Sequence, residues 1–281
     1  MTDKEFDQNY YVSFSYFLER ACGIVLGDKK QYLVRSRLTP LIKRFGFSSI
    51  NDFIYSVITG NETLQTAAIE AMTTNETLWF RDTYPFTLLE NSILSHLSKQ
   101  AKPLRIWSSA CSSGQEAYSI AMTILNFKKH YSYSFCSGIE IIGTDISEEM
   151  VQRCKSAEYD QLAISRGLPD KFKTDFFESV DNGKLRLKSH VKALANFKSF
   201  NLLDSYSSIG KFDIIFCRNV LIYFSPKVKK QVLQKIAACL HDNGILFLGA
   251  SEFISDLTDD FKTVKCDSGF YYIKKSYKTE S

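Results

Sequence analysis

Helical spacing of apolar residues marks the first 70 or so positions of the chain. Apolar side chains recur every three or four residues, and glycines follow as stop signals. The pattern predicts helices at 10–26, 29–45 and 48–60. Asp28 is the expected N-cap of the second helix, and Pro40 should kink or split that helix. No strand pattern interrupts these segments, so the sequence predicts a small helical bundle.

From Leu104 onward, apolar strands alternate with amphipathic helices. The predicted strands are 104–110, 138–146, 212–219 and 244–251, the helices are 115–130, 147–159 and 226–240, and an antiparallel hairpin at 261–275 follows. Strands of this apolar type, joined by helices, are typical of a parallel sheet that is covered on both faces. The fold class is therefore α/β, preceded by an all-α segment.

One stretch does not follow the alternation. Between Asp170 and Leu203 the sequence VDNGKLRL carries an Asn-Gly signal for a two-residue turn. This predicts a small antiparallel hairpin inserted into the α/β domain, after which NFKSFNL returns the chain to the main sheet.

The turn after the first predicted strand indicates which ligand the sheet binds. In an open parallel sheet, ligands bind beyond the carboxyl ends of the strands. The turn 110–114 contains one glycine, and neither G-x-G-x-x-G nor G-x-x-x-x-G-K-[ST] occurs in the chain. A pyrophosphate is therefore disfavoured, and Glu116 at the start of the next helix suits a cation or an amino group. Asp145, at the end of the second strand, is either a ribose acceptor or only the cap of the next helix. Together these residues favour S-adenosylmethionine, a nucleoside with a charged amino-acid tail.

Composition narrows the class of protein further. Of the 281 residues, 44% are hydrophobic and 23% are charged, which excludes wholesale disorder. The net charge of +4 is too small to indicate nucleic acid as the main partner. The seven cysteines form no CxxC pair, so neither a metal site nor a disulfide framework is expected. There is no signal-peptide pattern and no apolar run of roughly 18 residues, so we expect a cytoplasmic protein without membrane insertion.

Four motifs together resemble the CheR chemotaxis receptor methyltransferase family. They are TTNETLWFR (73–81), IWSSACSSGQEAYSIAM (106–122), IIGTDIS (141–147) and FDIIFCRNVLIYF (212–224), and GIVLGDKKQYLVRSRL near the N-terminus is similar too. The resemblance runs from about Phe14 to Ser251. It implies a Rossmann-like class I S-adenosylmethionine-dependent methyltransferase sheet with an inserted antiparallel β-subdomain, preceded by an all-α domain. The implied segments are a helical domain (1–72), a linker with a connecting helix (73–103) and a methyltransferase domain (104–281) with the insertion at about 170–200.

The resemblance also implies an activity and site residues. The activity is transfer of a methyl group from S-adenosylmethionine to glutamate side chains of chemoreceptors, which leaves S-adenosylhomocysteine. The implied cofactor-binding residues are Asn75, Thr77, Arg81, Glu116, Asp145, Asn201, Leu202, Arg218 and Asn219, and the implied catalytic residues are Arg81 and Tyr223. Considered without the family, Arg81 is a solvated linker charge and Tyr223 a core aromatic. Leu78 and Trp79 replace a more aromatic pair of the family, which could reshape the pocket wall.

The partners expected are the acidic methylation helices of receptors. Residues 29–45 contain six basic residues and no acidic one, so this segment is either a solvated helix face or a docking surface. The inserted hairpin either adds a receptor peptide as a strand or merely packs on the sheet. Nucleic acid is not expected, because RNVLIY stands where enzymes that methylate exocyclic amines often carry Asn/Asp-Pro-Pro-Tyr/Phe. The alternative function is a sensor or scaffold module that binds the cofactor without turnover.

Overall fold

The computed structural model describes residues 6–131, 135–254, 256–266 and 269–276. The chain forms two compact units. The helical unit comprises residues up to Thr74 together with 201–203 and 223–229, and the α/β unit comprises 75–200, 204–222 and the residues from Lys230 onward. The division falls after Thr74.

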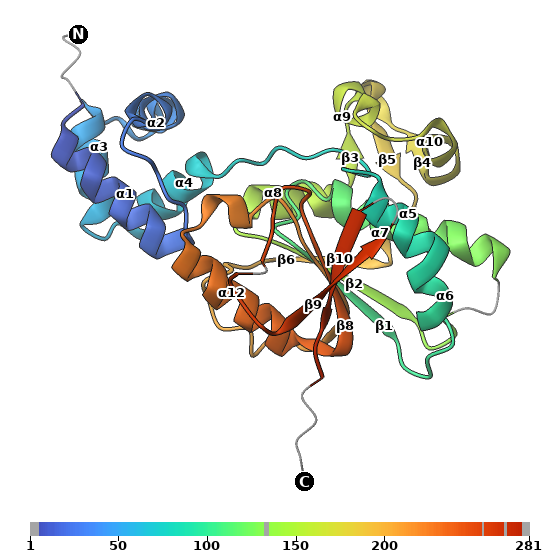
Figure 1. The fold of residues 1–281 in the computed structure, drawn as a ribbon. Helices are drawn as coiled ribbons and strands as arrows, with labels where there is room; N and C mark the ends of the chain where they lie inside the picture. Colours follow the sequence, from blue (N-terminus) through green and yellow to red (C-terminus); the bar gives the residue numbers. More distant parts are fainter. Residues whose placement is uncertain (1–5, 132–134, 255, 267–268, 277–281) are drawn as a thin grey trace. The chain divides into compact units, whose positions relative to one another are not determined.

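Within the described part of the chain, the helical unit contains the helices between residues 8 and 72 and the first residues of α12 (Pro226–Cys239) (Figure 1). The helices between residues 8 and 72 are α1 (Gln8–Cys22), α2 (Gln31–Phe45), α3 (Ile50–Ile58) and α4 (Glu62–Met72). Gly46 ends α2 in the left-handed conformation, with φ of 72°, as predicted. Gly23, with φ of 79°, ends α1 in the same way at Cys22, four residues before the end of the predicted helix 10–26. The sequence interpretation missed α4, whose buried positions are occupied by Leu64, Ala68 and Met72 at four-residue spacing.

The N-cap predicted for the second helix was wrong. Its N-cap is Lys30 rather than Asp28, and no side chain caps it. The helix continues from Gln31 to Phe45 through Pro40, so it is not split there. Lys29 and Lys30, which belong to the predicted basic helix, therefore precede the helix itself.

Arg37 of α2 has a structural role that its charge pattern did not indicate. Its guanidinium donates hydrogen bonds to the carbonyl oxygens of Met72 (2.6 Å) and Thr73 (2.8 Å) and to Oγ1 of Thr74 (2.9 Å). These acceptors lie at the end of α4, where helix carbonyls lack partners within the helix. Arg37 therefore caps α4.

A seven-stranded sheet forms the centre of the α/β unit, in the order β6-β2-β1-β7-β8-β10-β9 (Figure 1). Its strands are β1 (Leu104–Ser109), β2 (Ile139–Asp145), β6 (Ala195–Ser199), β7 (Phe212–Cys217), β8 (Leu240–Leu248), β9 (Phe261–Cys266) and β10 (Gly269–Lys274). The first five strands in this order pair in parallel, whereas β10 is antiparallel to both β8 and β9. This confirms the Rossmann-like sheet and the C-terminal hairpin.

Helices cover both faces of this sheet. On one face, Ile214 and Phe216 of β7 share a buried cluster with α7 (Gln115–His130), α8 (Glu148–Ser156) and the helical stretch α5 (Tyr84–Leu88), η1 (Leu89–Ile93) and α6 (Leu94–Leu97). On the other face, Trp107 stacks on Phe212, with ring centroids 5.6 Å apart, and meets the edge of Tyr206. Lys235 of α12 (Pro226–Cys239) lies over Tyr206, so α12 belongs to this second face.

A separate three-stranded antiparallel sheet follows α8, in the order β3-β5-β4. Its elements are β3 (Glu158–Tyr159), α9 (Gln161–Ser165), α10 (Asp170–Phe176), β4 (Phe177–Ser179), η2 (Asp181–Gly183) and β5 (Leu185–Leu187), with α11 (Ser189–Lys192) leading to β6. The predicted hairpin is β4–β5, but η2 joins its strands in place of a two-residue turn. The sheet also begins earlier than residue 170, because β3 pairs with β5.

Within the described ranges, no helix is long and apolar enough to cross a membrane. In the same ranges, no three His, Cys, Asp or Glu side chains gather as metal ligands would.

Candidate active site

The order of strands places the candidate site at the carboxyl ends of β1, β2 and β7. The sheet runs outward from β1 in both directions, to β2 on one side and to β7 on the other, which makes this edge the topological switch point. Ser109 pairs with Thr144 and with Cys217, so the three strands end level with one another. The residues that follow these strands are those that the sequence indicated.

The turn after β1 has an unusual backbone. Ala110, Ser112 and Gly114 all have positive φ, at 52°, 51° and 93°. A Cβ atom on Gly114 would lie 3.0 Å from Sγ of Cys154 and 3.2 Å from the hydroxyl of Tyr159, so both space and backbone favour glycine. Non-glycine residues in this conformation concentrate at ligand sites, where the surrounding structure holds them.

Asp145 holds this turn. Its carboxylate accepts hydrogen bonds from the backbone N–H of Ser112 (2.8 Å) and from that of Ser147 (3.0 Å). The side chain of Ser147 in turn caps α8 by accepting from Met150 N–H. Asp145 is buried, with 6% of its surface exposed. It therefore connects the turn to the start of α8, and either of its oxygens can accept further bonds.

Glu116 and Arg218 form a buried ion pair across the switch point. Nη1 of Arg218 lies 2.9 Å from Oε2 of Glu116, while Oε1 of Glu116 accepts a hydrogen bond from Ser108. Nη2 of Arg218 donates to Oδ2 of Asp82 (2.7 Å) and to the carbonyl of Arg81 (2.7 Å). Two carboxylates thus surround one buried guanidinium, and with Asp145 nearby in the fold the site keeps a net negative charge.

The segment with the predicted residues Asn75, Thr77 and Arg81 packs within the α/β unit. The carbonyl of Asn75 accepts a hydrogen bond from the hydroxyl of Ser112 in the turn after β1 (2.8 Å). Thr77 is partly buried, and Nη1 of Arg81 donates to the carbonyl of Glu76 (3.2 Å). The structure therefore brings this segment to the turn.

Trp79 anchors the same segment. Its side chain is fully buried and meets Tyr159 and Phe177 of the small sheet edge-on, with ring centroids 4.8 and 5.4 Å apart. The backbone N–H of Trp79 donates a hydrogen bond to the carbonyl of Arg166. A Cβ atom on Gly167 would lie 2.4 Å from the backbone carbonyl oxygen of Trp79. The family departure at Trp79 thus lies against the inserted subdomain.

The sequence interpretation missed Glu252. This carboxylate is 5% exposed and accepts hydrogen bonds from three backbone N–H groups, those of Asn219 (2.7 Å), Gly249 (2.7 Å) and Ile222 (3.2 Å). Asn219, which the sequence predicted as a cofactor contact, is held with φ of 58°. A glutamate right after a strand-end Gly-Ala-Ser is the one signal that could have drawn attention to it.

The Cys111 thiol near the turn is neutral. Sγ of Cys111 and Sγ of Cys154 are 4.0 Å apart, which is about twice the length of a disulfide bond. The hydrogen bond to Cys154, followed by burial, raises the pKa of Cys111 well above its ordinary value. Since the thiolate is the nucleophilic form, Cys111 is not a nucleophile at neutral pH.

Three predicted residues belong to the helical unit. The amide of Asn201 donates to the carbonyl of Ala21 (2.7 Å) and accepts from Leu203 N–H (3.0 Å), and Leu202 is buried. Tyr223 is partly buried, and its carbonyl accepts from Val25 N–H (2.9 Å). These contacts explain how the two short segments join the helices.

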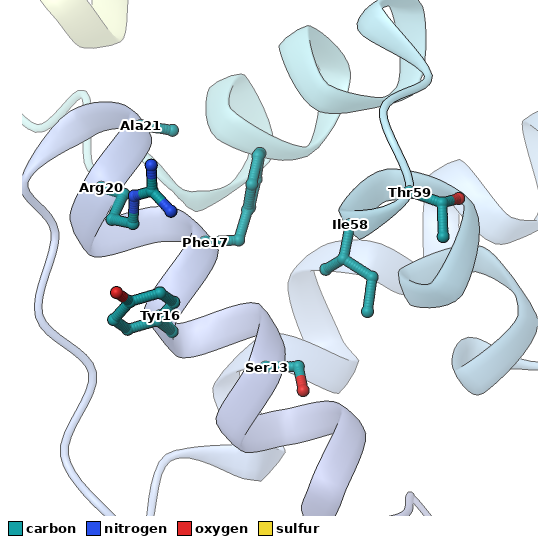
Figure 2. Close-up of a pocket in the computed structure, with 7 residues that line it drawn as sticks. All are labelled: Ser13, Tyr16, Phe17, Arg20, Ala21, Ile58 and Thr59. Atoms are coloured by element: carbon teal, nitrogen blue, oxygen red, sulfur yellow. The ribbon is translucent and has the colours of Figure 1, made fainter.

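A groove of about 630 Å³ lies between α1 and the end of α3 (Figure 2). Tyr16, Phe17 and Arg20 of α1 and Ile58 of α3 line it, together with Ser13, Ala21 and Thr59. None of the residues predicted for cofactor binding lines this groove, so it adds nothing to the predicted site.

The groups at the switch point fit S-adenosylmethionine. Buried carboxylates suit ribose hydroxyls, an ammonium and a sulfonium, whereas they repel phosphate. The fold and this site define a class I S-adenosylmethionine-dependent methyltransferase with an all-α N-terminal domain.

Comparison with known proteins identifies the family. Residues 75–270 match the model described as "CheR methyltransferase, SAM binding domain", and residues 11–73 match "CheR methyltransferase, all-alpha domain". The chain therefore belongs to the CheR methyltransferase family.

Chemotaxis protein methyltransferases of other bacteria are similar in sequence to this chain over nearly its full length. The chain is 50% identical to a chemotaxis protein methyltransferase of Vibrio parahaemolyticus and equally to one of Vibrio cholerae, over 97% of this chain and 99% of each relative. A chemotaxis protein methyltransferase of Pseudomonas putida is 46% identical over 94% of this chain and 98% of that protein.

Proposed function

We propose that the protein transfers a methyl group from S-adenosylmethionine to glutamate side chains of methyl-accepting chemotaxis receptors, in the cytoplasm. The observation that carries this proposal is the 50% identity to chemotaxis protein methyltransferases over 97% of the chain. The acidic switch-point site, which suits this cofactor, supports it. The product on the receptor is a glutamate methyl ester.

The reaction needs no general base. The pKa of a free glutamate is about 4.3, so the acceptor is already a carboxylate at neutral pH. When bound, S-adenosylmethionine supplies an electrophilic methyl group, and the glutamate oxygen gains the O–C bond as the C–S bond breaks. This agrees with the neutral state of Cys111 next to the site.

Alignment of the two reactants then supplies most of the catalysis. Holding them in the attack geometry contributes roughly 7–11 kcal/mol. Asp145 and Glu116 serve as acceptors for the cofactor's hydroxyl and ammonium groups, and Arg218 keeps the Glu116 carboxylate in place through the 2.9 Å ion pair. The backbone of Asn75, tied to the turn after β1, orients the segment that carries Thr77 and Arg81.

Arg81 and Tyr223 orient the acceptor. The planar guanidinium of Arg81 is suited to hold a carboxylate of either the substrate or the cofactor. The hydroxyl of Tyr223 donates one hydrogen bond to the attacking oxygen, while its ring faces the sulfonium. A stronger bond would lower the nucleophilicity of that oxygen, so the role of Tyr223 is orientation.

Docking of the receptor uses basic residues around α2. Lys29, Lys30, Lys43 and Arg44 are exposed, whereas Arg37 is engaged in capping α4. An acidic receptor helix suits this charge, and such contacts act mainly on the association rate and weaken with salt.

The small sheet offers a second contact. In the order β3-β5-β4, strand β4 lies at an edge, and its residues Glu178 and Ser179 are exposed. An edge strand of this kind accepts an extended receptor peptide as a further strand.

Methyl transfer to receptor-rich membranes, with radiolabelled S-adenosylmethionine, tests the proposed activity. Alkaline treatment must release the label as volatile methanol, because esters hydrolyse under these conditions and N-methyl groups do not. Tyr223→Phe should lower turnover and leave S-adenosylhomocysteine binding within about twofold of wild type. Binding of S-adenosylhomocysteine without any transfer would support the scaffold alternative instead.

Charge reversal tests the docking. Lys43→Glu with Arg44→Glu should raise KM for the receptor and reduce its salt dependence, with unchanged S-adenosylhomocysteine affinity. The matched control reverses Lys155 and Lys262, which are exposed on α8 and β9. Equal effects of both double variants would contradict a docking role for α2.

A further inference from the structure

The loops after β7 and β8 are tied together by Glu252. One oxygen of its buried carboxylate accepts from Asn219 N–H and Gly249 N–H, and the other accepts from Ile222 N–H. A Cβ atom on Gly249 would lie 2.7 Å from the side-chain Nδ2 of Asn219 and 2.7 Å from Oε2 of Glu252. The two loops therefore approach each other closely. Glu252 thus fixes the loop after β7 against the loop after β8.

Two large apolar side chains at this network are exposed. Ile222, whose N–H binds Glu252, is 48% exposed, and Phe253, which follows Glu252, is 66% exposed. Among the described residues of the α/β unit, Tyr131 and Leu162 are the other large apolar side chains that are exposed. An apolar side chain that stays in contact with water does not contribute the free energy that its burial would give. Apolar side chains that gather at one place on a surface mark contacts with a partner.

Phe253 is also held in place. Its ring stacks on that of Phe270 in β10, with centroids 5.3 Å apart and planes 23° apart, and Phe270 meets the edge of Tyr272. An exposed ring that is already ordered loses little conformational freedom when a partner covers it. This favours a binding role over a loosely exposed side chain.

The location decides which partner fits. The ends of β7 and β8 are neighbours, with Cys217 paired to Leu248, and the loop after β7 carries the predicted site residues Arg218 and Asn219. A protein segment that brings a glutamate to this loop must cross the carboxyl edge of the sheet, where Ile222 and Phe253 are exposed. On a helix, the residues three and four positions from that glutamate share its face.

We propose that Ile222 and Phe253 form an acceptor ledge, which contacts apolar side chains of the receptor helix beside the glutamate to be methylated. This inference rests on the proposed function, because it names the contact that the same substrate makes. The ledge adds specificity for the apolar neighbours of the acceptor, whereas the basic residues around α2 recognise charge.

Receptor methylation kinetics on the full chain test the ledge. Phe253→Ser and Ile222→Ser should each raise KM for the receptor about tenfold, with S-adenosylhomocysteine affinity within about twofold of wild type. Phe253→Leu keeps an apolar side chain and should restore most of the affinity. The control is Tyr131→Ser, which changes an aromatic side chain that is 59% exposed at the C-terminal end of α7 and should leave KM unchanged.

The outcomes are distinct. Wild-type KM in both serine variants would overturn the ledge, and so would a parallel loss of S-adenosylhomocysteine affinity, which would assign these residues to cofactor binding. An equal rise in KM for Tyr131→Ser would also overturn it, because any exposed aromatic side chain replaced by serine would then have the same effect. If the wild-type protein transfers no methyl group to receptors, the proposed function fails and the ledge fails with it.

Discussion

Replacement of Arg218 by methionine tests the buried ion pair most directly. The Arg218 side chain is 1% exposed and the Glu116 side chain 12% exposed. Methionine has a similar length but no charge, so Arg218→Met leaves the Glu116 carboxylate buried without its counter-ion. Removing one partner of a buried pair costs about 3–5 kcal/mol of unfolding free energy. The bond to Asp82 contributes less, because that carboxylate is 30% exposed and is screened by water.

A double-mutant cycle separates the ion pair from simple loss of packing. Glu116→Gln removes the carboxylate charge, and we expect this change alone to cost about 1–2 kcal/mol, because Arg218 keeps Asp82. The double variant has no unpaired charge at Glu116, so its cost should fall about 2 kcal/mol below the sum of the single costs. For a unit of 150–250 residues, that coupling corresponds to about 4–8 °C in Tm.

Urea unfolding and thermal melting of the four proteins measure this coupling. Calorimetric titration with S-adenosylhomocysteine measures the cofactor site, and we expect weaker binding in every variant that lacks Arg218 or Glu116. Strictly additive costs would refute the argument, because they would mean that the two side chains do not interact. Asp82→Asn is the matched control, with a coupling to Arg218 below about 1 kcal/mol.

Three further predictions follow from other contacts. Asp145→Ala should weaken S-adenosylhomocysteine binding by about 1.5–3 kcal/mol. As the control, Ser147→Ala removes the cap of α8 and should cost about 1 kcal/mol of unfolding free energy, with unchanged S-adenosylhomocysteine affinity. Equal affinity in both variants would mean that Asp145 does not contact the cofactor. Arg37→Met should lower the urea midpoint without altering cofactor affinity, and an unchanged midpoint would contradict its role as the cap of α4. Burial raises the pKa of Cys22 to about 11, so at pH 8 only about one such thiol in a thousand is ionised, and a thiol reagent should label the exposed Cys136 long before Cys22. Because the unfolded thiol ionises first, this residue should make stability fall as the pH rises from 9 to 11, and faster labelling of Cys22 than of Cys136 would refute its burial.

The secondary structure was largely predictable because its signals are local. The predicted helix 115–130 coincides with α7, and Ser147 caps α8 as expected. Errors arose where the local signal was weak or ambiguous. The alanine-rich α4 has a narrow apolar stripe, and Asp28 lies two residues before the helix cap that the backbone adopts.

The candidate site was predictable in part for the same reason. A single glycine in the turn after β1 and an acid at the end of β2 lie next to strands, so sequence position alone places them at the sheet edge. Their partners could not be predicted. Arg218 meets Glu116 across 102 residues of sequence, and Glu252 binds the Asn219 N–H across 33.

By itself, the sequence determined the α/β alternation, the glycines that end α1 and α2, and the acidic character of the cofactor edge. These features depend on periodicity and on hydrogen bonds between residues close in the chain. Only the tertiary structure decided that Arg218 forms an ion pair with Glu116, that Arg37 caps α4 and that Glu252 joins the loops after β7 and β8. The physical reason is that the register of parallel strands brings segments that are far apart in the sequence to one edge of the sheet. A local sequence pattern does not show which distant residues become neighbours in this way.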